Sequence, residues 1–278
     1  MSISALAQSQ QVEETINVNG VKREFTTYLP TDAIGGMPVV ISLHGGFASP
    51  KGQFKLADFR PIADKDKFIV VCPASKHGWE DGKDVGKIDE VKFIDQLISY
   101  LIKTYHANGN RIYVTGISKG GFMTARLACQ LSSRIAAVAI VAATLDSNEG
   151  YTPQYPMPIL FIHGTKDPIV SYNGGSLFGR EVYSHRDIIK KWAAIDNCNP
   201  KPVITNIPDK AGDGTSLIKE EYTNSATGMQ VIGYTVNNGG HTWPGGSQYL
   251  PRFLIGKTTK NLNACQTIWD FFKPYTLQ

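Results

Sequence analysis

The segment RIYVTGISKGG, at positions 111–121, is the part of the chain that points most clearly to a fold class. Its first half is a short β-branched and aromatic run, which is typical of a buried strand. Glycines then surround Ser118, and a helical pattern follows from about Gly120 to Leu131. A strand that passes through a tight glycine turn directly into a helix is the start of a strand–helix unit, and such units build α/β proteins.

Strands and helices continue to alternate on both sides of this stretch. Strands are predicted at 38–43, 68–72, 136–141, 159–162 and 230–236, and helices at 88–105, 184–195 and 262–272. The helix at 88–105 is the clearest, because its apolar residues recur at spacings of three and four. Alternating strands and helices form parallel crossover units, so we expect a mostly parallel central sheet with helices on both faces.

The amino-terminal part of the sequence predicts a β-hairpin. Residues 15–18 and 23–28 alternate polar and apolar side chains on either side of Asn19-Gly20, a pair that tolerates positive φ. This hairpin gives the sheet an antiparallel amino-terminal edge. Residues 1–12 carry little pattern and are expected to be a flexible segment. The rest of the 278 residues has no repeat and no proline-rich linker, which predicts a single domain over 13–278.

The composition excludes several classes of partner. The 28 Lys and Arg and the 24 Asp and Glu are scattered along the chain, and no basic run could follow a nucleic-acid backbone. The longest apolar stretch, at 135–143, is shorter than the roughly 20 residues of a membrane-spanning helix. We therefore expect neither nucleic acid nor a membrane as a partner.

The cysteines and histidines show no pattern of metal ligands. Cys72, Cys129, Cys198 and Cys265 are widely spaced and contain no CxxC pair, so they could form zero, one or two disulfides or remain buried thiols. No cluster of His, Cys and carboxylate residues has ligand spacing. We expect neither a metal nor an organic cofactor.

Ser118 is the candidate nucleophile. It stands at the centre of GISKG, residues 116–120, which matches the pattern G-x-S-x-G between a strand and a helix. The glycines fit this interpretation, because a turn that forces a serine into a strained conformation leaves no room for neighbouring side chains. A serine hydroxyl is a weak nucleophile at neutral pH, so a histidine that takes its proton is also required.

His241 is the candidate general base, because it lies in a glycine-rich loop between the last predicted strand and the last helix. Asp167 is the candidate acid, since it follows the strand at 159–162 and lies between Ser118 and His241 in the chain. Asp146, after the previous strand, is its main rival. His163 ends a strand and faces the same rim.

An acyl-transfer site also needs N–H donors for the oxyanion of the tetrahedral intermediate. The backbone of Lys119 supplies one by its position after the serine. The second is expected in HGGF, residues 44–47, directly after a strand; Gly46 is the first choice and Phe47 the second.

Trp79 and Trp243 lie in glycine-rich loops expected at the rim of this site. Either ring could bind an aromatic acyl group or a sugar by stacking, because a flat ring buries a large area at little entropic cost. The alternative is that both tryptophans only pack their loops against the rest of the protein.

Four segments agree in order and spacing with those of a known family: LHGG at 43–46, RIYVTGIS at 111–118, HGTKD at 163–167 and GHTWPG at 240–245. Together they resemble the polyhydroxybutyrate depolymerase and feruloyl esterase family of serine esterases. The resemblance implies an α/β-hydrolase fold over 13–278. It also implies the triad Ser118, Asp167 and His241. The oxyanion donors that it implies are Gly46 and Lys119.

The resemblance further implies a secreted or periplasmic enzyme that acts without a cofactor on polymer-linked esters. Release of feruloyl or acetyl groups from plant cell-wall polysaccharide is the preferred activity, and depolymerisation of polyhydroxybutyrate is the alternative. An oligopeptidase-like peptidase or an acyltransferase would use the same triad on the same fold. Residues 5–7, ALA, are similar to the end of a signal peptide, which weakly favours export. The sequence does not predict the oligomeric state.

Overall fold

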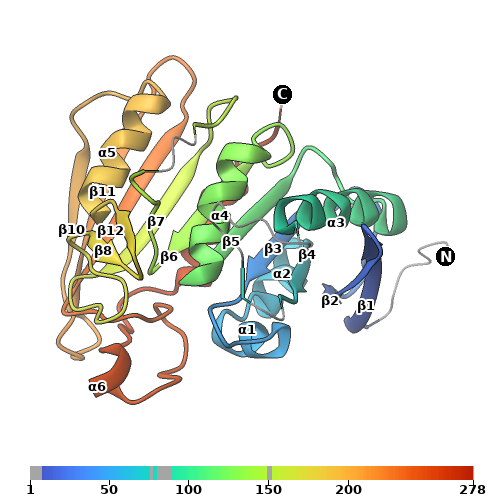
Figure 1. Ribbon diagram of the computed structural model, residues 1–278, viewed down its shortest axis with the longest axis horizontal. Helices are drawn as coiled ribbons and strands as arrows, with labels where there is room; N and C mark the ends of the chain where they lie inside the picture. Colours follow the sequence, from blue (N-terminus) through green and yellow to red (C-terminus); the bar gives the residue numbers. More distant parts are fainter. Residues whose placement is uncertain (1–7, 76–77, 80–88, 149–151, 278) are drawn as a thin grey trace.

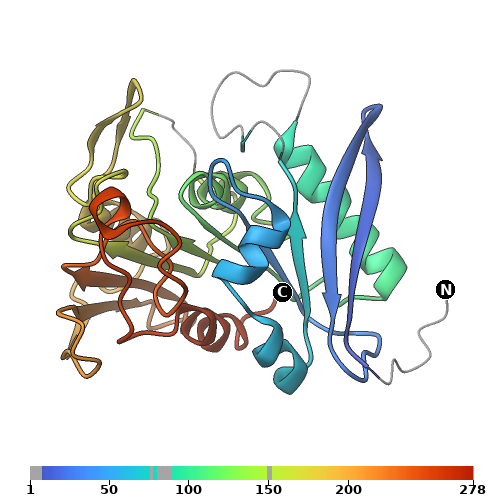
Figure 2. The ribbon, with the colours of Figure 1, turned by 90° about the horizontal axis from the view of Figure 1, so that it is seen from below.

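One ten-stranded sheet runs through the molecule. The computed structural model describes residues 8–75, 78–79, 89–148 and 152–277. The strand order is β1-β2-β4-β3-β5-β6-β7-β12-β11-β10, and helices cover both faces of the sheet (Figure 1 and Figure 2). The predicted α/β class with a large, mostly parallel sheet is confirmed.

Six neighbouring strands form the parallel centre of the sheet. They are β4 (Ile69–Pro73), β3 (Val39–Leu43), β5 (Ile112–Ile117), β6 (Ala137–Val141), β7 (Ile159–Gly164) and β12 (Gln230–Asn237). The first five are buried along their whole length. Helices on both faces explain this burial, and they explain why these strands read as continuous apolar runs.

The amino-terminal edge is the predicted antiparallel hairpin of β1 (Gln10–Val18) and β2 (Val21–Leu29), with β2 antiparallel to β4. Asn19 and Gly20 make its turn with φ of 52° and 82°. The predicted flexible segment 1–12 is too long at its end, because residues 10–12 pair with β2. Residues 1–7 lie outside the described residues.

The opposite edge is also antiparallel, which the sequence did not predict. There β12 pairs with β11 (Ser216–Thr223), and β11 pairs with β10 (Val203–Ile207). Four of the five residues of β10 are exposed, so this strand lacks the buried, apolar pattern by which a strand is recognised. A separate small hairpin joins β8 (Gly175–Leu177) to β9 (Arg180–Val182).

The helices divide between two hydrophobic cores, one on each face of the sheet. On one face lie α3 (Glu90–Tyr105), α4 (Lys119–Gln130) and α5 (His185–Ile195); on the other lie α1 (Pro50–Leu56), α2 (Arg60–Asp66) and α7 (Ala264–Phe272). Successive strand residues alternate between the cores: Val114 packs under the first group and Tyr113 under the second. A short helix, α6 (Arg252–Ile255), lies in the loop between β12 and α7.

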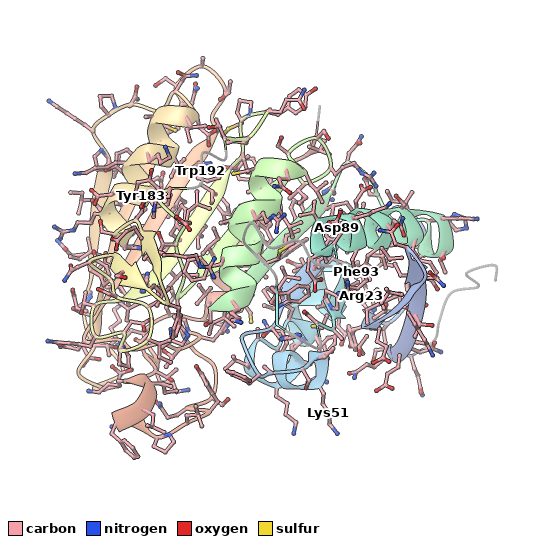
Figure 3. All side chains as sticks on the ribbon, viewed as in Figure 1. Arg23, Lys51, Asp89, Phe93, Tyr183 and Trp192 are labelled. Atoms are coloured by element: carbon pink, nitrogen blue, oxygen red, sulfur yellow. The ribbon has the colours of Figure 1, made fainter. Side chains whose placement is uncertain are left out.

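Arg23 fastens the amino-terminal hairpin to α3. Its guanidinium lies 3.9 Å from the ring centre of Phe93 and donates to Glu90 Oε2 at 2.6 Å, with both charged side chains buried. Figure 3 shows Arg23 and Phe93 side by side, close to Asp89. Asp89 caps the helix by accepting a hydrogen bond from the N–H of Lys92 at 2.9 Å. The hairpin is therefore held by a paired buried charge as well as by strand pairing.

All four cysteines are free thiols, and three of them, Cys72, Cys129 and Cys265, are buried. Within residues 8–75, 78–79, 89–148 and 152–277, no helix is long and apolar enough to cross a membrane. In the same residues, no three His, Cys, Asp or Glu side chains gather in a way that could hold a metal ion.

Candidate active site

The loops that follow β3, β5, β7 and β12 lie at the same end of the sheet, because these strands belong to its parallel centre and their carboxyl ends point in one direction. The segments that come after two of these loops, α1 and α6, lie in the lower part of the molecule in Figure 1. The residues predicted to carry the chemistry all belong to these loops.

Ser118 stands at the junction of β5 and α4 with φ of 56° and ψ of −123°. A non-glycine residue in this region of the Ramachandran plot carries strain of about 1–3 kcal/mol, which the surrounding structure must impose. Its backbone is held from both sides: Ser118 N–H donates to Val141 O, and Ser118 O accepts from the N–H of Phe122, each at 3.0 Å. This is the strained turn between strand and helix that the sequence predicted.

The glycines around Ser118 are required by space. A Cβ on Gly116 would lie 2.4 Å from the carbonyl oxygen of Gly120, and one on Gly120 would lie 2.4 Å from that of Leu43. At Gly121 it would lie 2.6 Å from the Cβ of Ala143. These distances are shorter than any real carbon contact, so α4 can follow the strand this closely only with hydrogen at each position.

The predicted oxyanion turn lies beside the serine. A Cβ on Gly45 would lie 3.7 Å from Ser118 Cβ, and one on Gly46 would lie 3.4 Å from Cδ of Lys119. The next residue, Phe47, has φ of 60° and its side chain is fully exposed. The turn and the start of α4 are therefore in contact, as two N–H donors to one oxyanion would require.

His44 anchors this turn and is itself buried. Its Nε2 accepts a hydrogen bond from the N–H of Ser75 at 3.1 Å, and its carbonyl oxygen accepts from Nε1 of Trp79 at 2.7 Å. Because both the ring and the carbonyl are held, His44 has a structural role at the start of the turn.

Asp167 lies in the turn after β7, and its side chain is wholly buried. Its Oδ1 accepts hydrogen bonds from the N–H groups of Ile169 and Val170, both at 2.8 Å. Its Oδ2 accepts from Nδ1 of His241 at 2.8 Å. The rival Asp146 accepts instead from the N–H of Asn148 at 2.8 Å.

The environment of Asp167 keeps it ionised. Burial raises the pKa of a carboxyl group, but here the hydrogen bonds from His163 and His241 outweigh burial, and the pKa of Asp167 lies well below its ordinary value. A negative carboxylate at neutral pH is what is needed to orient a neutral imidazole and to stabilise an imidazolium.

His241 is held by the loop that follows β12. Its N–H donates to Ile255 O at 2.6 Å, and its carbonyl oxygen accepts from the hydroxyl of Tyr249 at 2.9 Å. Because Nδ1 is bound to Asp167, Nε2 is the nitrogen left to act as a base. Tyr249 was not anticipated from the sequence, since nothing in the pattern around it distinguishes it from other loop residues.

The same loop reaches back to the oxyanion side of the site. A Cβ on Gly246 would lie 2.7 Å from the carbonyl oxygen of Leu56 in α1, which follows the oxyanion turn. Among the described residues, Asp167 is joined to His241 by a hydrogen bond, and none joins Ser118 Oγ to His241.

The two tryptophans are not at the rim, which corrects the expectation that they bind substrate. Trp79 and Trp243 are each 1% exposed, so neither ring offers a face to a ligand from solvent. Trp243 packs edge-on against Phe59 with ring centres 6.2 Å apart, and Trp79 lies 5.2 Å from the ring of His44. Both residues pack loops, the alternative that the sequence had left open.

Residues 24–174 match the family model described as Esterase PHB depolymerase. Feruloyl esterase B of Piromyces equi is 29% identical over 233 residues, which cover 73% of this chain and 42% of that protein. The bifunctional acetylxylan esterase/xylanase of Neocallimastix patriciarum is 29% identical over 153 residues, or 55% of this chain and 22% of that protein. The chain thus spans less than half the length of either relative.

A solved structure, the acetyl xylan esterase from Aspergillus awamori, superimposes with a TM-score of 0.58 at 15% sequence identity. The superposition covers 83% of this chain and 94% of that one. At this identity the likeness concerns the fold, and it shows that the chain has the α/β-hydrolase fold.

Proposed function

The chain belongs to the esterase PHB depolymerase family, and we propose that it is a serine esterase that releases feruloyl or acetyl groups from plant cell-wall polysaccharide. The two relatives compared above are named as esterases of these kinds. One observation carries the mechanism. His241 Nδ1 donates to the buried carboxylate of Asp167 at 2.8 Å, at the edge of the sheet where Ser118 occupies its strained turn.

In the proposed reaction, Ser118 Oγ attacks the ester carbonyl carbon while His241 Nε2 takes the hydroxyl proton. The tetrahedral intermediate collapses when His241 returns that proton to the departing alcohol, which leaves an acyl group on Ser118. Water then attacks the acyl-enzyme with the same base, and the carboxylic acid leaves. Asp167 keeps the imidazole in the correct tautomer and stabilises its charged form.

The oxyanion of this intermediate would be stabilised by the backbone N–H groups of Lys119 and Gly46. The support for this part is the packing of the Gly45–Gly46 turn against Ser118 and Lys119. Donors that are fixed before the reaction stabilise the developing charge without having to reorganise, and one such donor is worth roughly two to three orders of magnitude in rate.

Two relatives named for feruloyl and acetylxylan ester hydrolysis support the proposed substrate. Polymer-linked esters are too large to enter a cell, so we expect the enzyme to be exported and to act outside the cytoplasm. Fractionation of the producing cells checks this: the protein is expected in the medium or the periplasm, and its retention in the cytoplasm would contradict the proposed substrate.

Polyester hydrolysis is the second candidate, and exposed apolar side chains favour it. Phe47 follows the oxyanion turn, Phe178 lies in the β8–β9 hairpin, and Phe253 lies in α6 after the base, and all three are almost fully exposed. Exposed apolar side chains in the segments that follow β3, β7 and β12 would suit an apolar polymer.

A panel of initial rates decides between these substrates. We expect methyl ferulate or acetylated xylan to have a higher rate per enzyme than polyhydroxybutyrate, with short p-nitrophenyl esters as a general measure of esterase activity. The reverse order would favour the polyester. Cleavage of a peptide with no cleavage of any ester would contradict the proposal, and transfer of the acyl group to an added alcohol in preference to water would identify an acyltransferase.

A further inference from the structure

We propose that His163 is a positioning residue: it holds the carboxylate of Asp167 in the orientation that accepts the hydrogen bond from His241. His163 lies in β7 with its side chain 1% exposed, and its Nε2 is 3.3 Å from Asp167 Oδ2. That oxygen is the one that accepts from His241 Nδ1 at 2.8 Å. This inference rests on the proposed function, because Asp167 and His241 are the acid and base of that mechanism.

The neighbours of His163 determine which nitrogen carries its proton. Nε2 is 2.9 Å from the carbonyl oxygen of Val170 and 3.3 Å from the carboxylate oxygen of Asp167, and both of these groups only accept hydrogen bonds. Nε2 therefore carries a proton and shares it between the two oxygens. His163 thus donates to the same carboxylate oxygen as His241.

Asp167 thus has a complete set of donors. Oδ1 receives two backbone N–H groups from its own turn, those of Ile169 and Val170. Oδ2 accepts from the imidazole N–H groups of His163 and His241. Without His163, Oδ2 would have one donor, His241, and on that side the orientation of the carboxylate would depend on the catalytic contact alone.

The rest of the His163 ring packs against other aromatic rings and makes no further hydrogen bond among the described residues. Edge-on contacts join it to His185 and to Tyr172, with ring centres 5.6 Å and 5.9 Å away. Nδ1 of His163 and both ring nitrogens of His185 have no hydrogen-bond partner among the described residues. A second proton on His163 would therefore be buried without an acceptor, which is costly.

Among the described residues, the titratable groups that face His163 are Asp167 in the turn after β7, Tyr172 in the loop that follows and His185 at the start of α5. Burial lowers the pKa of His185 well below its ordinary value, so His185 is neutral. The hydroxyl of Tyr172 is bound to Oγ1 of Thr235 at 2.8 Å. Within the part of the chain that the structure describes, Asp167 is the one charged group that the ring of His163 contacts.

This arrangement predicts how the base responds to loss of His163. With one donor fewer, the charge on Oδ2 acts more fully on His241, so the imidazolium is favoured and the pKa of His241 rises. The carboxylate also loses its second restraint, so fewer molecules hold the productive geometry. The expected result is a kcat about tenfold lower, the factor that corresponds to one weak hydrogen bond to a charged group, with KM unchanged.

Three variants test the proposal. His163→Phe keeps an aromatic ring and removes the donor, His163→Gln keeps an N–H at a similar reach, and His185→Phe is the control in the same cluster without a contact to Asp167. In His163→Phe, the acidic limb of the kcat/KM profile is expected to move to higher pH by about half a unit to one unit. His163→Gln should restore most of kcat, and His185→Phe should move neither quantity.

A titration of the His241 ring by NMR gives a readout that does not depend on activity. Its pKa is expected to rise in His163→Phe and to stay at the wild-type value in His185→Phe, whether or not the proposed substrates are cleaved. An unchanged pKa of His241 in folded His163→Phe, or equal changes in both phenylalanine variants, would overturn the positioning role. If His163→Phe fails to fold, a comparison of His163→Gln with His163→Leu decides the same point.

Discussion

Gly164, the last residue of β7, and Gly239, two residues before His241, are in direct backbone contact: a Cβ on Gly164 would lie 2.3 Å from the carbonyl oxygen of Gly239. The same oxygen accepts a hydrogen bond from the N–H of Lys166 at 2.8 Å. The loop of the acid and the loop of the base are therefore joined backbone to backbone, and this contact sets the distance between Asp167 and His241.

Gly164→Ala is expected to separate these loops. Its Cβ meets backbone atoms that cannot move aside, so we expect a loss of about 1–3 kcal/mol in the free energy of unfolding and a fall in kcat/KM. Gly52→Ala is the matched control, because its Cβ would meet only Ser49 Oγ at 3.6 Å. Chemical denaturation and initial rates measure both variants; equal effects would show that the contact has no special role.

Asp167→Asn and Asp146→Asn test the choice of the acid. Asp167→Asn should lower kcat by about four orders of magnitude, as loss of the acid does in other serine hydrolases, because the amide favours the wrong tautomer of the histidine. Asp146→Asn should have little effect on kcat. Both carboxylates are buried, so thermal melting of each variant separates loss of fold from loss of chemistry. A larger loss of kcat in Asp146→Asn would mean that the acid had been assigned wrongly.

The buried carboxyl group of Asp196 should make the free energy of unfolding depend on pH. Burial raises the pKa of Asp196 to about 7, against the opposing hydrogen bond from the N–H of Met157. The unfolded chain then loses this proton near pH 4 and the folded chain near pH 7, so the folded state is destabilised as pH rises between these values. The slope is at most about 1.4 kcal/mol per pH unit.

Asp196→Asn should remove that contribution, because the amide keeps the acceptor for Met157 and never ionises. The difference in unfolding free energy between variant and wild type, from urea melts at pH 4 to 8, is expected to rise in favour of the variant up to about pH 7 and then stay level. Asp95→Asn, on the exposed side of α3, is the control. A difference that does not change with pH would mean that Asp196 is already charged in the folded protein.

Trp79→Ala tests the correction to the role of the tryptophans. The ring is buried and its N–H holds His44, so the variant should lose about 3–5 kcal/mol of stability. The ratio of kcat/KM for aryl and alkyl esters should stay the same, since the ring offers no face to substrate. Initial rates at a temperature where the variant is folded provide the check, and a selective loss of aryl esters would restore the substrate-binding role.

The parts of the fold that the sequence predicted are those set by local rules. The close approach of Gly116 to Gly120 and the three-and-four spacing of α3 depend on residues a few positions apart, so both can be recognised in the sequence. The strand β10 was missed because its exposed side chains carry no burial signal, and it is held by backbone pairing with β11.

The candidate site, too, could be predicted from the sequence only in part. Asp167 could be chosen by chain order, since the fold places the acid after a late strand. The burial of Trp243 depends on Phe59, which lies far away in the sequence, and the donor role of His163 depends on the carbonyl of Val170. Such contacts are properties of the folded chain, and a single sequence does not display them.

Covalent labelling of Ser118 is the most direct test of its proposed role as the nucleophile. The protein is treated with a small organophosphonate that reacts with activated serines, and peptide mass spectrometry locates the adduct. We predict one phosphonyl group on Ser118, loss of activity in proportion to labelling, and no labelling of folded Ser118→Ala or His241→Ala. Full activity after labelling, or an adduct on another residue in an inactivated enzyme, would contradict it.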